Sequence, residues 1–195
     1  MIEQLIQFDQ KLFTLLNGWG IPFFDPVMRL ASATWIWIPV YLFLILFMLK
    51  SGRRKGIWAV IFLIITYFLT EQLSVHAFKE VFERLRPCHD PDMAERVRLV
   101  VNSCGGRFSF VSTHATNASG LVVFSILFFM KKSFTWPLLI WALIVSYSRI
   151  YVGVHYPGDI LGGWILGTII GLLTFALFKL IYQRQLLNGP TSKEN

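Results

Sequence analysis

Long apolar stretches alternate with short polar ones along most of this 195-residue chain. A membrane-spanning helix needs roughly 20 predominantly apolar residues, and five stretches approach or exceed that length. They cover about 30–49, 57 to the mid-seventies, 113–130, 136–152 and 158–182. The pattern therefore predicts an all-α, polytopic membrane helix bundle with about five transmembrane helices.

The first residues follow a different pattern. Polar residues separate apolar ones that recur at helical spacing between residues 2 and 17: Leu5, Phe8, Leu12, Phe13 and Leu16. This pattern is typical of an amphipathic helix that lies in the membrane interface without crossing. Residues 183–195 are expected to form a frayed polar tail. No repeat or second domain is visible, so we expect 1–195 to be a single membrane-embedded domain.

Three details refine the predicted spans. Pro39 is expected to kink the first one. The second is expected to continue as a helix beyond the lipid, through Lys79 to Leu85, where Arg86-Pro87 ends it. In the last span, glycines at four-residue spacing predict close helix packing: Gly163, Gly167 and Gly171.

Composition agrees with a membrane protein. The chain is 55% hydrophobic and 15% charged, whereas a soluble domain is nearer 25% charged. Its mean hydropathy is +0.58. The net charge of +7 raises the question of nucleic acid, but the basic residues flank apolar spans or lie in polar clusters. They form no basic stripe interleaved with aromatic residues, so we expect no nucleic-acid partner.

Basic residues in alternate turns orient the chain. The following fall on one predicted face, which the positive-inside rule makes cytoplasmic: Arg53, Arg54, Lys55, Lys131, Lys132, Lys179 and Arg184. Segments 77–112 and 150–157 then face outward. The only cysteines, Cys88 and Cys104, lie in that outward loop. A disulfide there would contribute about 3 kcal/mol. The alternative is two free thiols in a cytoplasmic loop.

Three polar clusters interrupt the apolar pattern near the outward face. They are Lys79 with Arg86-Pro87, then Ser112-Thr113-His114, then Ser148-Arg149 with His155 and Asp159. Charged groups and imidazoles are expensive beside lipid and persist mainly where they have a function. The clusters supply cations, two imidazoles and a carboxylate, which together can bind a phosphate and attack it.

The first two clusters each have an ordinary structural explanation as well. Lys79 and Arg86 are two helical turns apart and are expected on the same helix face, so both side chains can reach one phosphate. Alternatively they snorkel to the interface, with Lys79 paired to Glu83. Ser112 suits an N-cap position, and a helix start can hold a phosphate close to His114. Alternatively it is a plain capped helix with an interfacial histidine.

The third cluster favours chemistry more clearly. Arg149 ends an apolar span, where a guanidinium needs an anion. Pro157 suits the first position of the last helix, which places Asp159 in its first turn. Its carboxylate can then hold His155, four residues earlier, in one tautomer and orientation, as in an activated nucleophile. The alternative is a capped helix with a chance histidine.

These residues, in this order, resemble the type 2 phosphatidic acid phosphatase superfamily. The family pattern is Lys-x6-Arg-Pro, Pro-Ser-Gly-His and Ser-Arg-x5-His-x3-Asp. The first is complete here as Lys79…Arg86-Pro87, and the third as Ser148-Arg149…His155…Asp159. The second departs from it, because Val111 replaces proline and Thr113 replaces glycine. The likeness covers roughly residues 75–165 closely and the whole chain in span layout.

The resemblance implies a double displacement on a phosphate. His155 is the expected nucleophile, Asp159 its orienting acid and His114 the general acid and base. The phosphate is expected to be bound by Lys79, Arg86, Ser112, Thr113 and Arg149. No metal and no cofactor are implied, since His76 and His89 lack ligand spacing.

The site lies at span ends, where a lipid headgroup lies. We therefore expect a multi-pass phosphatase of the bacterial inner membrane whose active site faces the periplasm or the cell exterior. It would act on a lipid phosphate or diphosphate, such as undecaprenyl diphosphate, a lipid A phosphate or phosphatidylglycerol phosphate. Its other expected partners are membrane lipids, and the sequence leaves the oligomeric state open. One alternative is a lipid phosphotransferase of the same family. The other is a non-enzymatic anion or lipid transporter, which usually shows repeat symmetry and a polar midplane path.

Overall fold

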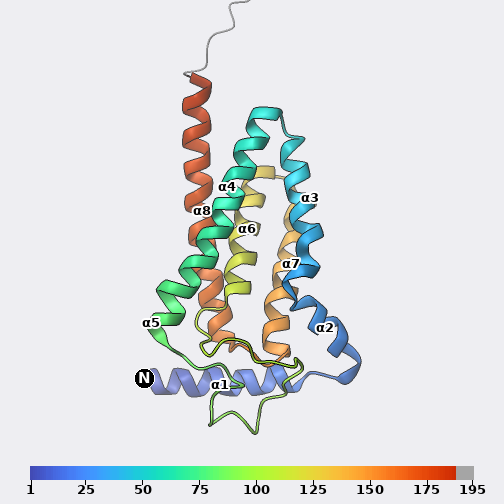
Figure 1. Cartoon of the computed structure of the whole chain (residues 1–195), viewed down its shortest axis with the longest axis vertical. Helices are drawn as coiled ribbons and strands as arrows, with labels where there is room; N and C mark the ends of the chain where they lie inside the picture. Colours follow the sequence, from blue (N-terminus) through green and yellow to red (C-terminus); the bar gives the residue numbers. More distant parts are fainter. Residues whose placement is uncertain (188–195) are drawn as a thin grey trace, which may run out of the picture.

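The computed structural model describes residues 1–187, and within that range the chain is helical apart from its connecting segments (Figure 1). The helices are α1 (Ile2–Gly18), α2 (Asp25–Ala31), α3 (Ile38–Leu49), α4 (Arg53–Gln72), α5 (Glu80–Phe82), α6 (Thr113–Phe129), α7 (Lys132–Tyr151) and α8 (Pro157–Leu187). Two short 3₁₀ helices, Pro22–Phe24 and Thr34–Trp37, flank α2, and a π-helix, Leu73–Lys79, links α4 to α5.

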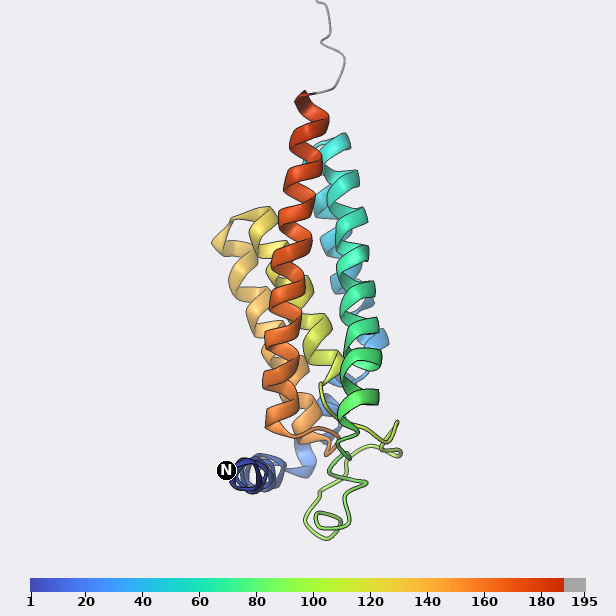
Figure 2. The same ribbon diagram turned by 90° about the vertical axis from the view of Figure 1, so that its left-hand side faces the viewer.

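Helices α3, α4, α6, α7 and α8 run side by side as a bundle, and α1 lies across one end of it (Figures 1 and 2). The segment between α5 and α6 folds at the same end. Side chains fix α1 there. Asn17, fully buried near its end, donates from Nδ2 to the carbonyls of Ile150 (3.0 Å) and Tyr151 (2.9 Å). Helix α1 is therefore fixed across this end of the bundle.

Length and composition make some of these helices able to cross a bilayer. Within residues 1–187 the continuous helical segments Arg53–Phe82 and Pro157–Gln185 meet both criteria, and a bent pair, Pro22–Ala31 with Thr34–Leu49, makes a third if it is one span. Helix α6 is apolar but shorter. Large apolar side chains are exposed on the outer faces of the bundle, among them Leu46, Ile64, Leu143 and Leu173. Such faces suit contact with lipid.

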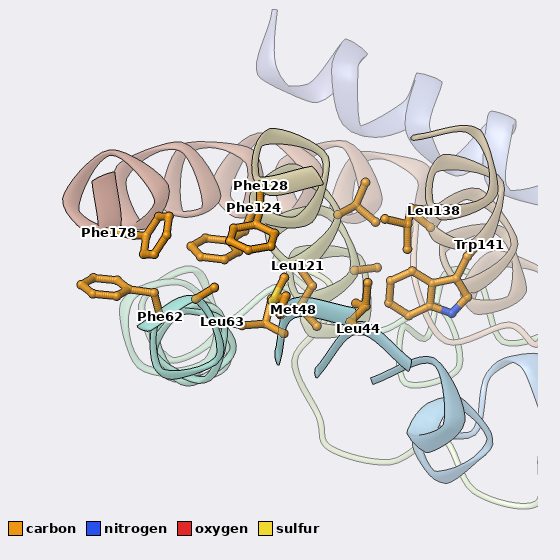
Figure 3. Packing of buried hydrophobic residues seen from close by; sticks show 14 of the residues in the cluster. Leu44, Met48, Phe62, Leu63, Leu121, Phe124, Phe128, Leu138, Trp141 and Phe178 are labelled. Carbon is orange, nitrogen blue, oxygen red and sulfur yellow. The ribbon is translucent and has the colours of Figure 1, made fainter. Parts of the chain in front are cut away.

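The centre of the bundle is packed by aliphatic and aromatic side chains from α3, α4, α6, α7 and α8 (Figure 3). Phe178 of α8 makes an edge-to-face contact with Phe62 of α4 at 5.9 Å between ring centroids, and with Phe124 of α6 at 6.0 Å. Helices α6 and α8 come especially close at the predicted glycines. A Cβ on Gly163 would lie 2.8 Å from the Ser112 carbonyl oxygen, and one on Gly171 2.7 Å from that of Gly120. The predicted close packing is confirmed.

The first predicted span is not one kinked helix. The chain breaks between Ala31 and Thr34, and the segments on either side are bent by 68°. Pro39 lies in the first turn of α3 instead of causing a kink inside a helix. The fixed φ of proline suits a helix start, and its missing N–H costs nothing there.

The second span also ends earlier than predicted. The helix stops at Phe82, and Glu83 takes a left-handed conformation with φ 46°. Arg86 therefore lies beyond the helix, in an extended segment where Leu85 pairs with Phe108. The expectation that Lys79 and Arg86 share a helix face is wrong. Within residues 1–187, no ion pair joins Lys79 to Glu83 either.

The connection between α5 and α6 is stabilised by a disulfide between Cys88 and Cys104, whose Cα atoms are 6.1 Å apart. Of the two states considered for these cysteines, the structure has the bonded one. At the other end of the chain, α8 continues to Leu187, five residues past the predicted end of the last span. The rest of the predicted polar tail, residues 188–195, lies outside the described residues.

Candidate active site

The three polar clusters meet at the end of the bundle across which α1 lies. Six of the eight predicted site residues line one cavity of ≈ 240 Å³: Lys79, Arg86, Thr113, His114, Arg149 and His155. The other two, Ser112 and Asp159, are fully buried beside it. The predicted site residues therefore come together from the π-helix, from two connecting segments and from the ends of α6, α7 and α8.

His155 and Asp159 form a buried pair. The His155 Nδ1 and the Asp159 Oδ2 are 3.3 Å apart, and the Tyr156 backbone N–H donates to the same oxygen at 2.8 Å. The imidazole is 1% exposed. Burial, with the positive charges of Arg149, Arg86 and Lys79, holds the pKa of His155 well below its usual value. With Nδ1 directed at the carboxylate, Nε2 of a neutral imidazole is free to act as a nucleophile.

Arg84 contacts the carboxylate of this pair, a role that was not predicted from the sequence. Its Nη1 contacts Asp159 Oδ1 at 2.9 Å and its Nη2 contacts Asp9 Oδ2 at 2.7 Å. The guanidinium also lies 4.1 Å from the ring centroid of Tyr156. Burial alone lowers the pKa of Arg84, but the two carboxylates outweigh it and raise the pKa overall. Arg84 thus links α1 to the acid that holds His155.

Backbone carbonyls hold the cations at the cavity. Arg86 donates from Nη1 to the Cys104 carbonyl at 2.8 Å and from Nε to that of Phe108 at 3.3 Å. Arg149 donates to the carbonyl of Ser32 at 3.1 Å and to its hydroxyl. The Arg149 Nε is buried and has no partner among the described residues. These guanidiniums are fixed in place while keeping donors free for an anion.

The second cluster occupies the start of α6. Ser112 is the N-cap residue, as predicted, but its side chain makes no capping bond, and its Oγ is buried without a partner in residues 1–187. Its backbone N–H donates to the Asp159 carbonyl at 3.0 Å, which ties α6 to α8. His114, in the first turn, lies 3.3 Å through Nε2 from the Thr34 hydroxyl. An unpaired hydroxyl at a helix start is suited to an anion.

Two further observations concern the surroundings of this cavity. Within residues 1–187, no group of three or more histidine, cysteine, aspartate or glutamate residues has the geometry to hold a metal ion. A larger cavity of ≈ 830 Å³ lies between α1 and α8. Its lining is mainly apolar and includes none of the eight predicted residues, so the smaller cavity is the candidate active site.

Comparisons with known proteins agree with this geometry. The sequence model of the PAP2 superfamily matches residues 56–182. The chain is 33% identical to a lipid A 4'-phosphatase from Porphyromonas gingivalis, over 91% of this chain and 75% of that protein. It is 35% identical to an undecaprenyl-diphosphatase from Sulfolobus acidocaldarius, over 88% and 79% respectively. The crystal structure of a transmembrane PAP2-type phosphatidylglycerolphosphate phosphatase from Bacillus subtilis has the same fold, with a TM-score of 0.70, 23% identity, and coverage of 98% of this chain and 90% of that one.

Proposed function

This chain belongs to the PAP2 superfamily and is a membrane lipid phosphatase, and from that premise we propose that it hydrolyses a lipid phosphate or diphosphate through a phosphohistidine. Lipid A phosphates, undecaprenyl diphosphate and phosphatidylglycerol phosphate are the candidate substrates. One observation carries the proposal. A buried histidine held by an aspartate lines the same cavity as three cations and a second histidine.

In the first step, Nε2 of His155 attacks phosphorus and the bond from phosphorus to the lipid oxygen breaks. His114 gives a proton to that oxygen, which leaves as an alcohol, or as a lipid monophosphate when the substrate is a diphosphate. Asp159 stabilises the positive charge that develops on the imidazole. Lys79, Arg86 and Arg149 neutralise the phosphoryl oxygens, so most of the catalysis comes from charges already in position.

In the second step, His114 takes a proton from water, and the water oxygen attacks phosphorus. The bond between phosphorus and Nε2 breaks, inorganic phosphate leaves, and His155 returns to its neutral form. The Ser112 hydroxyl and the backbone N–H groups at the start of α6 bind the phosphoryl oxygens in both steps. Thr113 carries a side chain at the position where the family pattern has glycine, and its Oγ1 accepts a hydrogen bond from Ser74 at 3.1 Å. This hydrogen bond directs the Thr113 side chain toward the π-helix that follows α4.

We infer five membrane crossings, by α2–α3, α4, α6, α7 and α8, with the site at one membrane surface and α1 in the interface. Exposed apolar side chains on α1, including Leu5 and Phe8, support that position. The basic residues of the α3–α4 and α6–α7 turns gather at the opposite end, where Lys55 and Lys131 line one surface pocket. By the positive-inside rule that end is cytoplasmic and the site faces the periplasm of a bacterial inner membrane.

The proposal is tested by phosphate release from a panel of purified lipid phosphates in detergent micelles. His155→Ala should lower kcat at least about a thousandfold, because the nucleophile is lost. His76→Ala is the matched control, since this exposed histidine pairs with Glu80 outside the cavity. Activity of His155→Ala within tenfold of the wild type would contradict the role of nucleophile. Acid-labile phosphate on a denatured Asp159→Asn or wild-type protein after rapid quenching would support the intermediate.

A further inference from the structure

One part of the cavity accepts hydrogen bonds where the rest donates them. Glu71 of α4 and Asn117 of α6 line the cavity together with the cations. The Asn117 Nδ2 donates to Glu71 Oε2 at 2.6 Å. Because an ionised carboxylate only accepts, this bond fixes the orientation of the amide and directs its Oδ1 elsewhere. Sequence reasoning gave neither residue a role.

The amide oxygen is left without a donor. Asn117 is 7% exposed, and its Oδ1 is buried with no partner in residues 1–187. A buried acceptor without a partner is costly, and one on a side chain that lines a cavity suggests a ligand that donates to it. The Glu71 carboxylate keeps further lone pairs for the same purpose. Two adjacent acceptors beside three cations therefore suit a ligand that carries both negative charge and hydrogen-bond donors.

The position of the pair indicates which part of the ligand it meets. Asn117 lies three residues after His114, so it is one helical turn farther along α6 than the group that protonates the leaving oxygen. Glu71 lies about two turns before Lys79 on the continuous helical segment. The atoms of the leaving alcohol next to the scissile oxygen would therefore lie beside the pair. The cavity volume of ≈ 240 Å³ is about eight times the share of one liquid water, which leaves room for such atoms beyond the phosphate.

We propose that Glu71 and Asn117 form a headgroup subsite for hydroxyl or ammonium groups on the alcohol that carries the scissile phosphate. The inference rests on the proposed function and narrows its substrate class to glycosyl or polyol phosphates of the lipid A type. A polyprenyl diphosphate offers no such donors on its leaving group. It also brings a second phosphate, whose charge the Glu71 carboxylate repels.

The test compares two purified substrates in the same detergent: bisphosphorylated lipid A, which carries sugar hydroxyls, and farnesyl diphosphate, which has none. The wild type should show a kcat/KM at least about tenfold higher for lipid A. Glu71→Gln should lower the ratio of the two kcat/KM values at least about tenfold, because an NH2 donor replaces one of the two acceptor oxygens. Asn117→Leu should shift the ratio in the same direction. Phosphatidylglycerol phosphate, whose leaving group carries a glycerol hydroxyl, distinguishes a requirement for a sugar from a requirement for any hydroxyl group.

Glu80→Gln is the matched control. This exposed glutamate lies on the same helical segment as Glu71, but outside the cavity, and it pairs with His76. It should leave the ratio unchanged. A loss that is equal for both substrates in Glu71→Gln and Asn117→Leu would overturn the subsite and leave the phosphatase intact, since a purely structural role affects both alike. A wild type that prefers farnesyl diphosphate would also overturn it. A wild type that hydrolyses no lipid phosphate contradicts the proposed function itself.

Discussion

At the scale of single residues, His155 shows how burial and charge would prepare the proposed nucleophile. Its ring is almost completely buried, and nearby cations add to the cost of protonating it. The sequence predicted its pairing with Asp159, because the two residues are four apart across a helix start that Pro157 marks. The same reasoning did not find Arg84, Glu71 or Asn117. Their partners are 46 to 75 residues away in the chain, and only the fold brings them together.

The lowered pKa of His155 makes stability depend on pH. In the unfolded chain the imidazole has a pKa of about 6.5, whereas in the folded protein it stays neutral to lower pH. As the pH falls below about 6.5, the unfolded state therefore binds a proton that the folded state does not, and stability decreases. Between pH 6.5 and 5.5 this contribution is about 1 kcal/mol.

Unfolding of the purified protein in detergent, followed at several pH values, measures this effect. His155→Gln removes the titrating group while keeping a polar side chain of related size. The wild type should lose about 1 kcal/mol more than this variant between pH 6.5 and 5.5. Parallel pH curves for the two proteins would show that His155 titrates as freely as in the unfolded chain.

At the scale of elements, α1 does more than lie across the bundle. Arg84 joins Asp9 of α1 to Asp159 of α8, and the second oxygen of Asp9 accepts from the Gly158 backbone N–H at 2.7 Å. The orientation of Asp159, which contacts the proposed nucleophile, therefore depends on the docking of α1. Arg84→Ala leaves the Asp159 carboxylate without its cation, and a buried charge without a partner is strongly unfavourable.

We expect Arg84→Ala to lower kcat about 10- to 100-fold with a smaller change in KM, because Arg84 does not line the phosphate cavity. Arg84→Lys should restore part of the loss, and Asp9→Asn should give a milder one. Arg96→Ala, a change at an exposed arginine of the same connecting segment, is the control. A change in KM alone, or no rescue by lysine, would show that Arg84 acts on substrate binding or on folding instead.

The elements also show where prediction from the sequence succeeds. Hydrophobic runs located the bundle helices well, since 20 apolar residues are a strong local signal. The ends of the helices were harder to predict. The second span stops at Phe82, and the chain then pairs Leu85 with Phe108. The first breaks before Thr34, where Trp37 donates from Nε1 to the Ala31 carbonyl at 2.9 Å. The Leu85–Phe108 contact depends on the final fold, and neither contact has a pattern of its own in the sequence.

At the scale of the whole molecule, the two ends differ in chemistry. One end holds the cavity and the disulfide. Helix α1 lies across that end, while the basic turns lie away from it (Figure 2). The disulfide is part of the site, because the Cys104 carbonyl is the one that receives Arg86 Nη1. Disulfides persist in oxidising compartments outside the cytosol. The disulfide and the basic turns thus give independent support to one orientation in the membrane.

That orientation is tested by labelling single cysteines in cells. Cys88 and Cys104 are the only cysteines of the chain, so replacing both with serine gives a background in which one reporter is added at a time. Asp92→Cys places it in the exposed segment at the site end, and Lys131→Cys at the exposed basic turn. With the outer membrane permeabilised, a membrane-impermeant maleimide should label the first in intact cells and the second only after lysis. The reverse pattern would put the basic turns outside and the cavity in the cytosol. In that case the phosphatase would act on lipids of the inner leaflet, and neither the charge of the turns nor the disulfide would explain its position.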